Sequence, residues 1–115
     1  MRAAVVDDDR ADAALVRIEL EDAGWEVDVY LSGAALVDAV RRGLCPDVAV
    51  VDLVMPPPDG PTTIRLLRDA AASLPVVALT GMVRDSARVM LGDLGVALLR
   101  KPLTAQALVA ALEAL

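Results

Sequence analysis

The chain has 115 residues, 57% of them hydrophobic, and a formal net charge of −6, which fits a single domain over residues 1–115. It contains neither an apolar run near the roughly 20 residues of a transmembrane helix nor a signal-peptide pattern, so we expect a cytoplasmic protein without membrane insertion. The negative charge disfavours direct binding to nucleic acid, and the absence of histidine excludes a phosphohistidine carrier and a serine–histidine catalyst.

The first elements that we expect are a strand at Arg2–Val6 and a helix at Asp9–Ala23. Apolar residues recur in the helix at helical spacing, and the pattern predicts an apolar face made of Ala11, Leu15 and Ile18, flanked by Leu20. Gly24 ends the helix, because glycine readily adopts the left-handed conformation found after helices. Glu26–Tyr30 has alternating character, which indicates a strand at an edge of the sheet.

The middle of the chain continues the alternation of helices and strands. The second helix is expected at Ser32–Arg42, with its first residue as the N-cap and Gly43 at its end. Three of its side chains face inward: Leu36, Val37 and Val40. Asp47–Val51 is a continuously apolar strand, as in a central parallel position covered on both faces. Gly60-Pro61 begins the third helix, since proline at the first position loses no intrahelical hydrogen bond.

The last part of the chain supplies two more strands and two more helices. Pro75–Leu79 and Val96–Leu99 are predicted strands, with a helix between them near Arg84–Asp93. Thr104 caps a final helix that runs to the end of the sequence. Strands that alternate with helices imply a parallel sheet with right-handed crossovers and helices on both faces. Binding sites in such sheets form at the carboxyl ends of the strands.

Polar residues stand at those strand ends: Asp7, Asp8, Asp52, Thr80 and Lys101. Carboxylates can hold a divalent cation and accept a phosphoryl group, a hydroxyl can bond its oxygens, and an ammonium can neutralise its charge. Lys101 lies two strand spacings from Asp52, about 9.6 Å, which a long side chain can span. Crowded carboxylates raise one another's pKa values, and Mg²⁺ would resolve that conflict with oxygen ligands. Asp9 is better explained as a helix N-terminal acid.

Four motifs closely resemble the receiver domain of bacterial two-component response regulators. They are VDD at Val6–Asp8, DLVMPPPDG at Asp52–Gly60, LTG at Leu79–Gly81, and the pair Lys101-Pro102. The resemblance covers the whole chain. It implies a flavodoxin-like α/β fold, a doubly wound (βα)5 unit whose five parallel strands have the order 2-1-3-4-5. It also suggests that the Lys101–Pro102 peptide bond is cis.

The resemblance also implies a role for each site residue. Asp52 is the phosphoacceptor, and Thr80 and Lys101 contact the phosphoryl oxygens. The implied Mg²⁺ ligands are Asp8, Asp52 and the backbone carbonyl of Val54, with Asp7 acting mostly through water. The phosphoryl donor is a histidine kinase or a histidine phosphotransfer protein. The surface of the fourth helix, fifth strand and fifth helix carries the output, and the resemblance leaves a homodimer open.

Three departures from the family pattern bear on these expectations. Leu98 stands where the family usually has an aromatic switch residue, so we expect a modest response that acts mainly through Thr80. Three consecutive prolines, Pro56–Pro58, predict a stiff loop. Val54 and Met82 are apolar where polar side chains often orient the attacking water, which predicts slow loss of the phosphoryl group.

Two other classes of protein share parts of this pattern. A phosphatase of the haloacid-dehalogenase type also uses an aspartyl nucleophile and Mg²⁺. It needs a second aspartate two residues later as the general acid, however, and that position is Val54. An interaction module that acts without phosphorylation would keep the fold and lose site residues. All of them are retained here, so this alternative rests only on Leu98.

Overall fold

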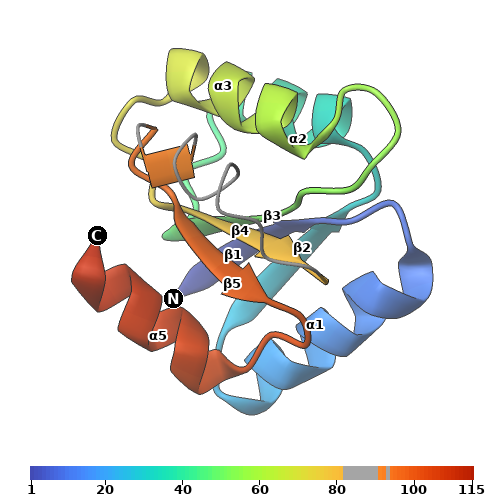
Figure 1. The fold of residues 1–115 in the computed structure, drawn as a ribbon, viewed down its shortest axis with the longest axis vertical. Helices are drawn as coiled ribbons and strands as arrows, with labels where there is room; N and C mark the ends of the chain where they lie inside the picture. Colours follow the sequence, from blue (N-terminus) through green and yellow to red (C-terminus); the bar gives the residue numbers. More distant parts are fainter. Residues whose placement is uncertain (82–90, 93) are drawn as a thin grey trace.

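The computed structural model describes residues 1–81, 91–92 and 94–115, which form one five-stranded sheet in the order β2-β1-β3-β4-β5 (Figure 1). The strands are β1 (Arg2–Val6), β2 (Glu26–Tyr30), β3 (Val48–Asp52), β4 (Val76–Thr80) and β5 (Ala97–Arg100). Every pairing is parallel. The predicted flavodoxin-like order is confirmed, with β2 at an edge and β3 at the centre. The predicted bounds of β3, β4 and β5 are one residue too early.

Helices cover both faces of the sheet. They are α1 (Arg10–Asp22), α2 (Gly33–Arg41), α3 (Gly60–Ala70) and α5 (Ala105–Ala114). Figure 1 shows α2 and α3 on one face and α1 and α5 on the other. The helix predicted near Arg84–Asp93 lies almost wholly outside the described residues. Within the part that the structure describes, no helix has the length and apolar character needed to cross a membrane.

The core consists of two layers separated by the sheet. Side chains of β3 alternate between them, because successive residues of a strand point to opposite faces. Ala49 and Val51 pack in the layer under α2 and α3, whereas Val48 and Val50 pack in the layer under α1 and α5. All five residues of β3 are buried. The strand therefore ends in Asp52, which is itself buried at the edge of the sheet.

Side-chain caps define where the helices begin. A side-chain oxygen accepts hydrogen bonds from backbone N–H groups of the first turn at four N-caps: Asp9, Ser32, Asp59 and Thr104. Two of these, Ser32 and Thr104, were predicted as caps, and the helix-terminal interpretation of Asp9 is also confirmed. Gly24 and Gly43 follow helix ends with φ of 93° and 111°, a conformation that glycine adopts at low cost.

The predicted buried face of α1 is wrong. Of the residues named for this face, the flanking Leu20 is buried, together with Ala13 and Val16, whereas Leu15 and Ile18 are 66% and 58% exposed. Both sets recur at helical spacing, so periodicity alone does not choose between the two faces. Packing against the sheet decides, and it leaves two large apolar side chains of α1 in solvent.

Candidate functional site

The predicted site residues that follow or end the strands meet at the carboxyl edge of the sheet. Val6 of β1 pairs with Val51 of β3, so the next residues along the two strands, Asp7 and Asp52, are neighbours across adjacent strands. Asp7 is 2% exposed, and Asp52 and Thr80 are each 5% exposed. The backbone N–H of Lys101 donates to the Thr80 carbonyl over 2.8 Å, which joins the ends of β4 and β5.

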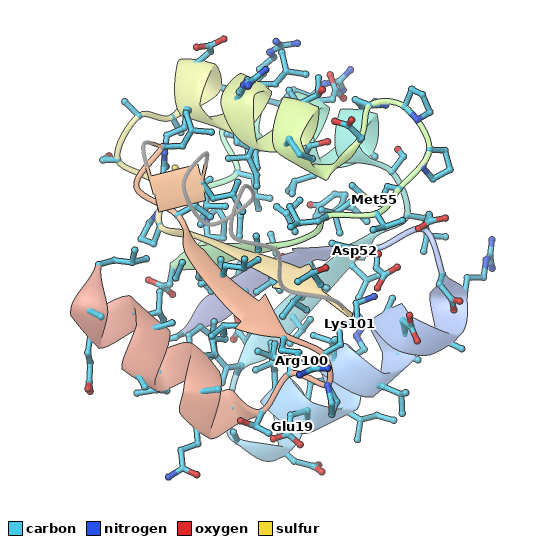
Figure 2. All side chains as sticks on the ribbon, viewed as in Figure 1. Glu19, Asp52, Met55, Arg100 and Lys101 are labelled. Atoms are coloured by element: carbon cyan, nitrogen blue, oxygen red, sulfur yellow. The ribbon has the colours of Figure 1, made fainter. Side chains whose placement is uncertain are left out.

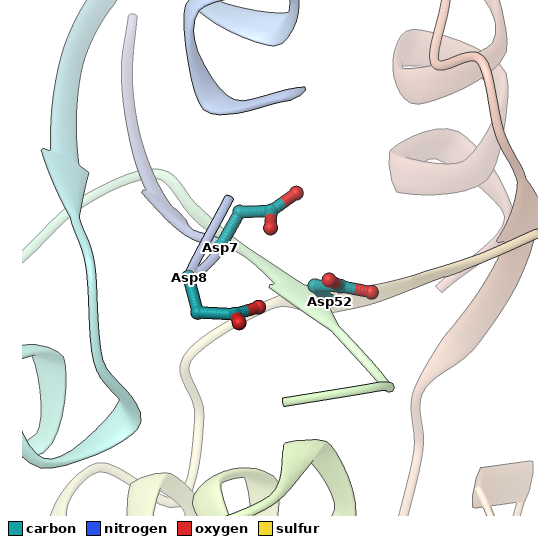
Figure 3. A group of neighbouring side chains, drawn as sticks. All are labelled: Asp7, Asp8 and Asp52. Carbon is teal, nitrogen blue, oxygen red and sulfur yellow. The ribbon is translucent and has the colours of Figure 1, made fainter. Parts of the chain in front are cut away.

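Three carboxyl groups form an acidic cluster at this edge. Asp7, Asp8 and Asp52 each offer one oxygen, and these oxygens lie within 4.8 Å of one another. Figure 3 shows the side chains of Asp7 and Asp8 directed towards Asp52. Asp8 is exposed, so the cluster opens to solvent on one side. A compact set of oxygen donors with room for water suits Mg²⁺, which keeps several waters when it binds to proteins.

Lys101 reaches this cluster from the end of β5 (Figure 2). Its Nζ lies 3.4 Å from an oxygen of Asp52 and 3.4 Å from an oxygen of Asp7. A third carboxylate, Asp12 of α1, is 3.2 Å away. The sequence interpretation paired Lys101 with Asp52 and did not anticipate Asp12. The available signal was that Asp12 lies in the first turn of the helix that follows the acidic pair.

The crowding changes the protonation of Asp52. Burial raises its pKa and the negative charge of Asp7 raises it further, while Lys101 and the N–H of Val54 oppose the rise, so the pKa reaches about 6. Burial disfavours the charged form of Lys101, but Asp52, Asp7 and Asp12 outweigh this effect and raise its pKa. The site is therefore one in which negative charge exceeds positive charge until a cation binds.

The loop after Asp52 is held close to the start of α3. The N–H of Val54 donates to an Asp52 carboxyl oxygen over 3.3 Å, and the N–H of Gly60 donates to the carbonyl of Leu53. A Cβ on Gly60 would stand 2.4 Å from the Cα of Leu53 and 2.6 Å from the carbonyl oxygen of Asp52. Only glycine permits this approach. Sequence analysis recognised Gly60 as a helix start and missed its contact with the backbone of Asp52.

The structure describes two of the residues that depart from the family pattern, Leu98 and Val54. Leu98 is partly buried and packs against the core layer under α2 and α3, which confirms ordinary strand packing at this position. Val54 is 76% exposed, and Met82 lies outside the described residues. The Lys101–Pro102 bond is cis, as predicted, and Pro57–Pro58 is a second cis bond that the sequence analysis did not anticipate.

Comparisons with known proteins identify the class to which this fold and this strand-end site belong. The family model of the response regulator receiver domain matches residues 3–113. A crystal structure of a response regulator receiver domain protein from Clostridium thermocellum has a TM-score of 0.86 at 27% identity, and covers 98% of this chain and 91% of that chain. The Vibrio cholerae chemotaxis protein CheY4 has a TM-score of 0.85 at 23% identity over 98% of this chain and 96% of its own, and shares the fold.

Curated relatives agree with this class. Response regulator MprA of Mycobacterium avium (strain 104) is 36% identical over 116 aligned positions, which cover 100% of this chain and 50% of that protein. MprA of Mycobacterium leprae (strain TN) is also 36% identical with the same coverage. The chain belongs to the receiver domain family of two-component response regulators. It spans about half the length of the curated relatives that it matches.

Proposed function

We propose that this receiver domain carries a phosphoryl group on Asp52, which it takes from a phosphohistidine of a histidine kinase or a histidine phosphotransfer protein. The observation that carries this proposal is a buried carboxyl at the end of β3 with an ammonium 3.4 Å away and two further carboxylates beside it. We place the reaction in the cytoplasm and assign it to residues 1–115 acting as one receiver domain.

In the proposed reaction, an Asp52 oxygen forms a bond to phosphorus while the bond between phosphorus and the histidine nitrogen breaks, and its electron pair stays on that nitrogen. Lys101 stabilises the negative charge on the transferring oxygens. Thr80, at the end of β4, donates its hydroxyl to a phosphoryl oxygen.

The donor set at the strand ends fits Mg²⁺. Asp8, Asp52 and the backbone carbonyl of Val54 would hold the ion, with Asp7 acting mostly through water. The cation would neutralise the crowded carboxylates and the charge on the transferring group. The Asp52 pKa of about 6 is consistent with this need, because a nucleophilic carboxylate must be ionised when the phosphoryl donor arrives.

The same site fits the function of an aspartyl phosphohydrolase less well. Such an enzyme needs an acid two residues after the nucleophile to protonate the leaving group. Val54 occupies that position, and this residue is exposed and has no acidic group. We therefore assign the domain a signalling role in which it takes part in its own phosphorylation and dephosphorylation.

Intact mass measurement tests the proposal. The protein is incubated with a small phosphodonor such as acetyl phosphate, with Mg²⁺ or with a chelator. We expect a gain of one phosphoryl mass with Mg²⁺ only, and none in Asp52→Ala. Asp69→Asn, which changes an exposed acid of α3, serves as the matched control and should be modified like the wild type. Full modification of Asp52→Ala would refute the assignment.

A further inference from the structure

Lys101 is held between two sets of carboxylates. On one side are Asp7 and Asp52 at the ends of the central strands, each 3.4 Å from its Nζ. On the other side is Asp12 of α1, which is the nearest of the three at 3.2 Å. Asp7 and Asp52 belong to the acidic cluster that suits a cation, and Asp12 is not one of its members. The ammonium therefore has one partner whose charge a bound cation would not directly neutralise.

Asp12 is fixed in place by the helix that carries it. Its backbone N–H donates to the Asp9 side chain over 3.1 Å as part of the N-cap of α1. Farther along the helix, Glu19 accepts a hydrogen bond of 3.0 Å from the N–H of Ala105 at the start of α5. These contacts join α1 to the segment that follows β5. Asp12 thus faces Lys101 from a capped and anchored helix rather than from a loose surface position.

A bound cation would change the balance among the three partners. The positive charge of the ion offsets the negative charge of Asp7 and Asp52, so their attraction for Lys101 falls. The attraction of Asp12 is reduced less, because it lies outside the cluster. A phosphoryl group on Asp52 would then have to draw the ammonium away from Asp12, or share it.

We propose that Asp12 is a positioning residue that holds the ammonium of Lys101 in the unphosphorylated protein and competes with the phosphoryl group for it. This inference rests on the proposed phosphorylation of Asp52. Phosphorylation then exchanges the Lys101–Asp12 ion pair for contacts with the phosphoryl oxygens. The competition opposes phosphorylation, because the new contacts of Lys101 with the phosphoryl oxygens must be more favourable than the ion pair with Asp12 that they replace.

Removing the Asp12 charge should strengthen binding at the phosphoryl position. The Asp12 side chain is 45% exposed, so the gain should be that of a partly solvated ion pair. We expect beryllofluoride, a phosphoryl mimic, to bind Asp12→Asn about two- to fivefold more tightly than the wild type in the presence of Mg²⁺. Asp12→Glu, which keeps the charge, should return the affinity towards that of the wild type.

The sequence offers a direct probe, because Lys101 is the only lysine in the chain. Protein labelled with ¹⁵N,¹³C-lysine gives one set of lysine side-chain NMR signals. With Mg²⁺ alone, we expect the Nζ and Cε signals of Asp12→Asn to move away from the wild-type positions. Asp22→Asn, which removes the same charge from an exposed position at the end of α1, should leave both the signals and the beryllofluoride affinity unchanged.

The outcomes separate the inference from the proposed function. If Asp12→Asn and Asp22→Asn both match the wild type in signal and affinity, Asp12 does not hold Lys101. If Asp12→Asn binds beryllofluoride more weakly, Asp12 assists the phosphoryl group and the competition is refuted. A wild-type protein that accepts neither a phosphoryl group nor beryllofluoride would refute the proposed function and with it the competition. In that case the NMR signals still decide whether Asp12 holds Lys101.

Discussion

The two ends of the sheet differ in how their charged side chains are balanced by neighbouring groups. At the amino ends of β4 and β5, the guanidinium of Arg68 donates to the carbonyls of Leu74, Leu94 and Gly95. Burial lowers the pKa of Arg68, but its donors face oxygen acceptors. At the carboxyl ends, three carboxylates crowd around one lysine. At the amino ends, hydrogen bonds from one guanidinium to backbone carbonyls stabilise the fold. At the carboxyl ends, negative charge exceeds positive charge, which favours binding of a cation.

Removal of the Arg68 side chain should have the largest effect on stability. Arg68→Ala leaves three backbone carbonyls without their donor, and each loss of a bond to a charged group is costly. We expect the free energy of unfolding to fall by about 2–4 kcal/mol, measured by urea denaturation. Arg41→Ala, at an exposed position on α2, is the matched control and should change it little. If the two variants lost the same free energy of unfolding, the Arg68 hydrogen bonds would not stabilise the amino end of the sheet.

Neutralising Asp52 should raise the free energy of unfolding in the absence of metal, whereas removal of the Arg68 side chain lowers it. Its pKa of about 6 in the folded protein lies above the ordinary value of 3.8, so the folded state binds this proton more tightly than the unfolded chain does. Stability therefore falls as the pH rises from 3.8 towards 6, and the destabilisation is complete above 6. Asp52→Asn should gain about 1–3 kcal/mol at neutral pH in a chelator.

Thermal unfolding between pH 4 and 8 measures this effect. The difference in stability between Asp52→Asn and the wild type should grow with pH in the chelator and shrink when Mg²⁺ is added. A difference that is the same at every pH would mean that the Asp52 charge is already balanced in the metal-free protein.

Gly60→Ala tests whether the backbone near Asp52 needs the close approach of α3. The added methyl would collide with backbone atoms of Leu53 and Asp52, so the loop must shift. We expect this shift to lower the free energy of unfolding by about 1–3 kcal/mol. Phosphorylation with acetyl phosphate and Mg²⁺ should slow as well. A Cβ on Gly92 would meet no atom of the described residues within 4 Å, so Gly92→Ala should leave the rate unchanged. A Gly60→Ala protein with normal stability and rate would show that the loop adapts freely.

The smallest effect is expected at Val54. An asparagine there could orient a water opposite the phosphoryl bond, which the exposed valine cannot do. We expect Val54→Asn to shorten the phosphoryl lifetime about threefold, followed as loss of the phosphoryl mass under excess Mg²⁺. Val109→Asn, at an exposed valine of α5, controls for the polar substitution. An unchanged lifetime in Val54→Asn would exclude this position from control of the rate.

Sequence patterns predicted the fold well because its signals are local. Alternating apolar runs marked the strands, and side-chain caps such as Ser32 and Thr104 marked helix starts. The parallel order then followed from the family resemblance. The buried face of α1 was predicted wrongly because Leu15 and Ile18 form a periodic set as regular as the one that packs.

Long-range pairings were harder to predict. The sequence analysis correctly predicted that Asp7, Asp52 and Lys101 lie close together, because the topology alone places the carboxyl ends of the strands on one edge. The Lys101–Asp12 ion pair joins residues 89 positions apart, and it depends on how α1 is rotated against the sheet. The Arg68 contacts with Leu94 and Gly95 likewise depend on tertiary packing. The only sequence signal for the first pairing is the position of Asp12 in the first turn of α1, and no periodic pattern or motif marks the second.

The central claim is that the crowded end of the sheet accepts a phosphoryl group at Asp52. Borohydride reduction after treatment with acetyl phosphate and Mg²⁺ tests it most directly, because an acyl phosphate is reduced to an alcohol and a phosphorylated aspartate becomes homoserine. Peptide mapping by mass spectrometry then locates the modified residue. The account predicts homoserine at position 52 alone and none when Mg²⁺ is chelated. Homoserine at Asp7 or Asp8 with an unmodified Asp52 would contradict it.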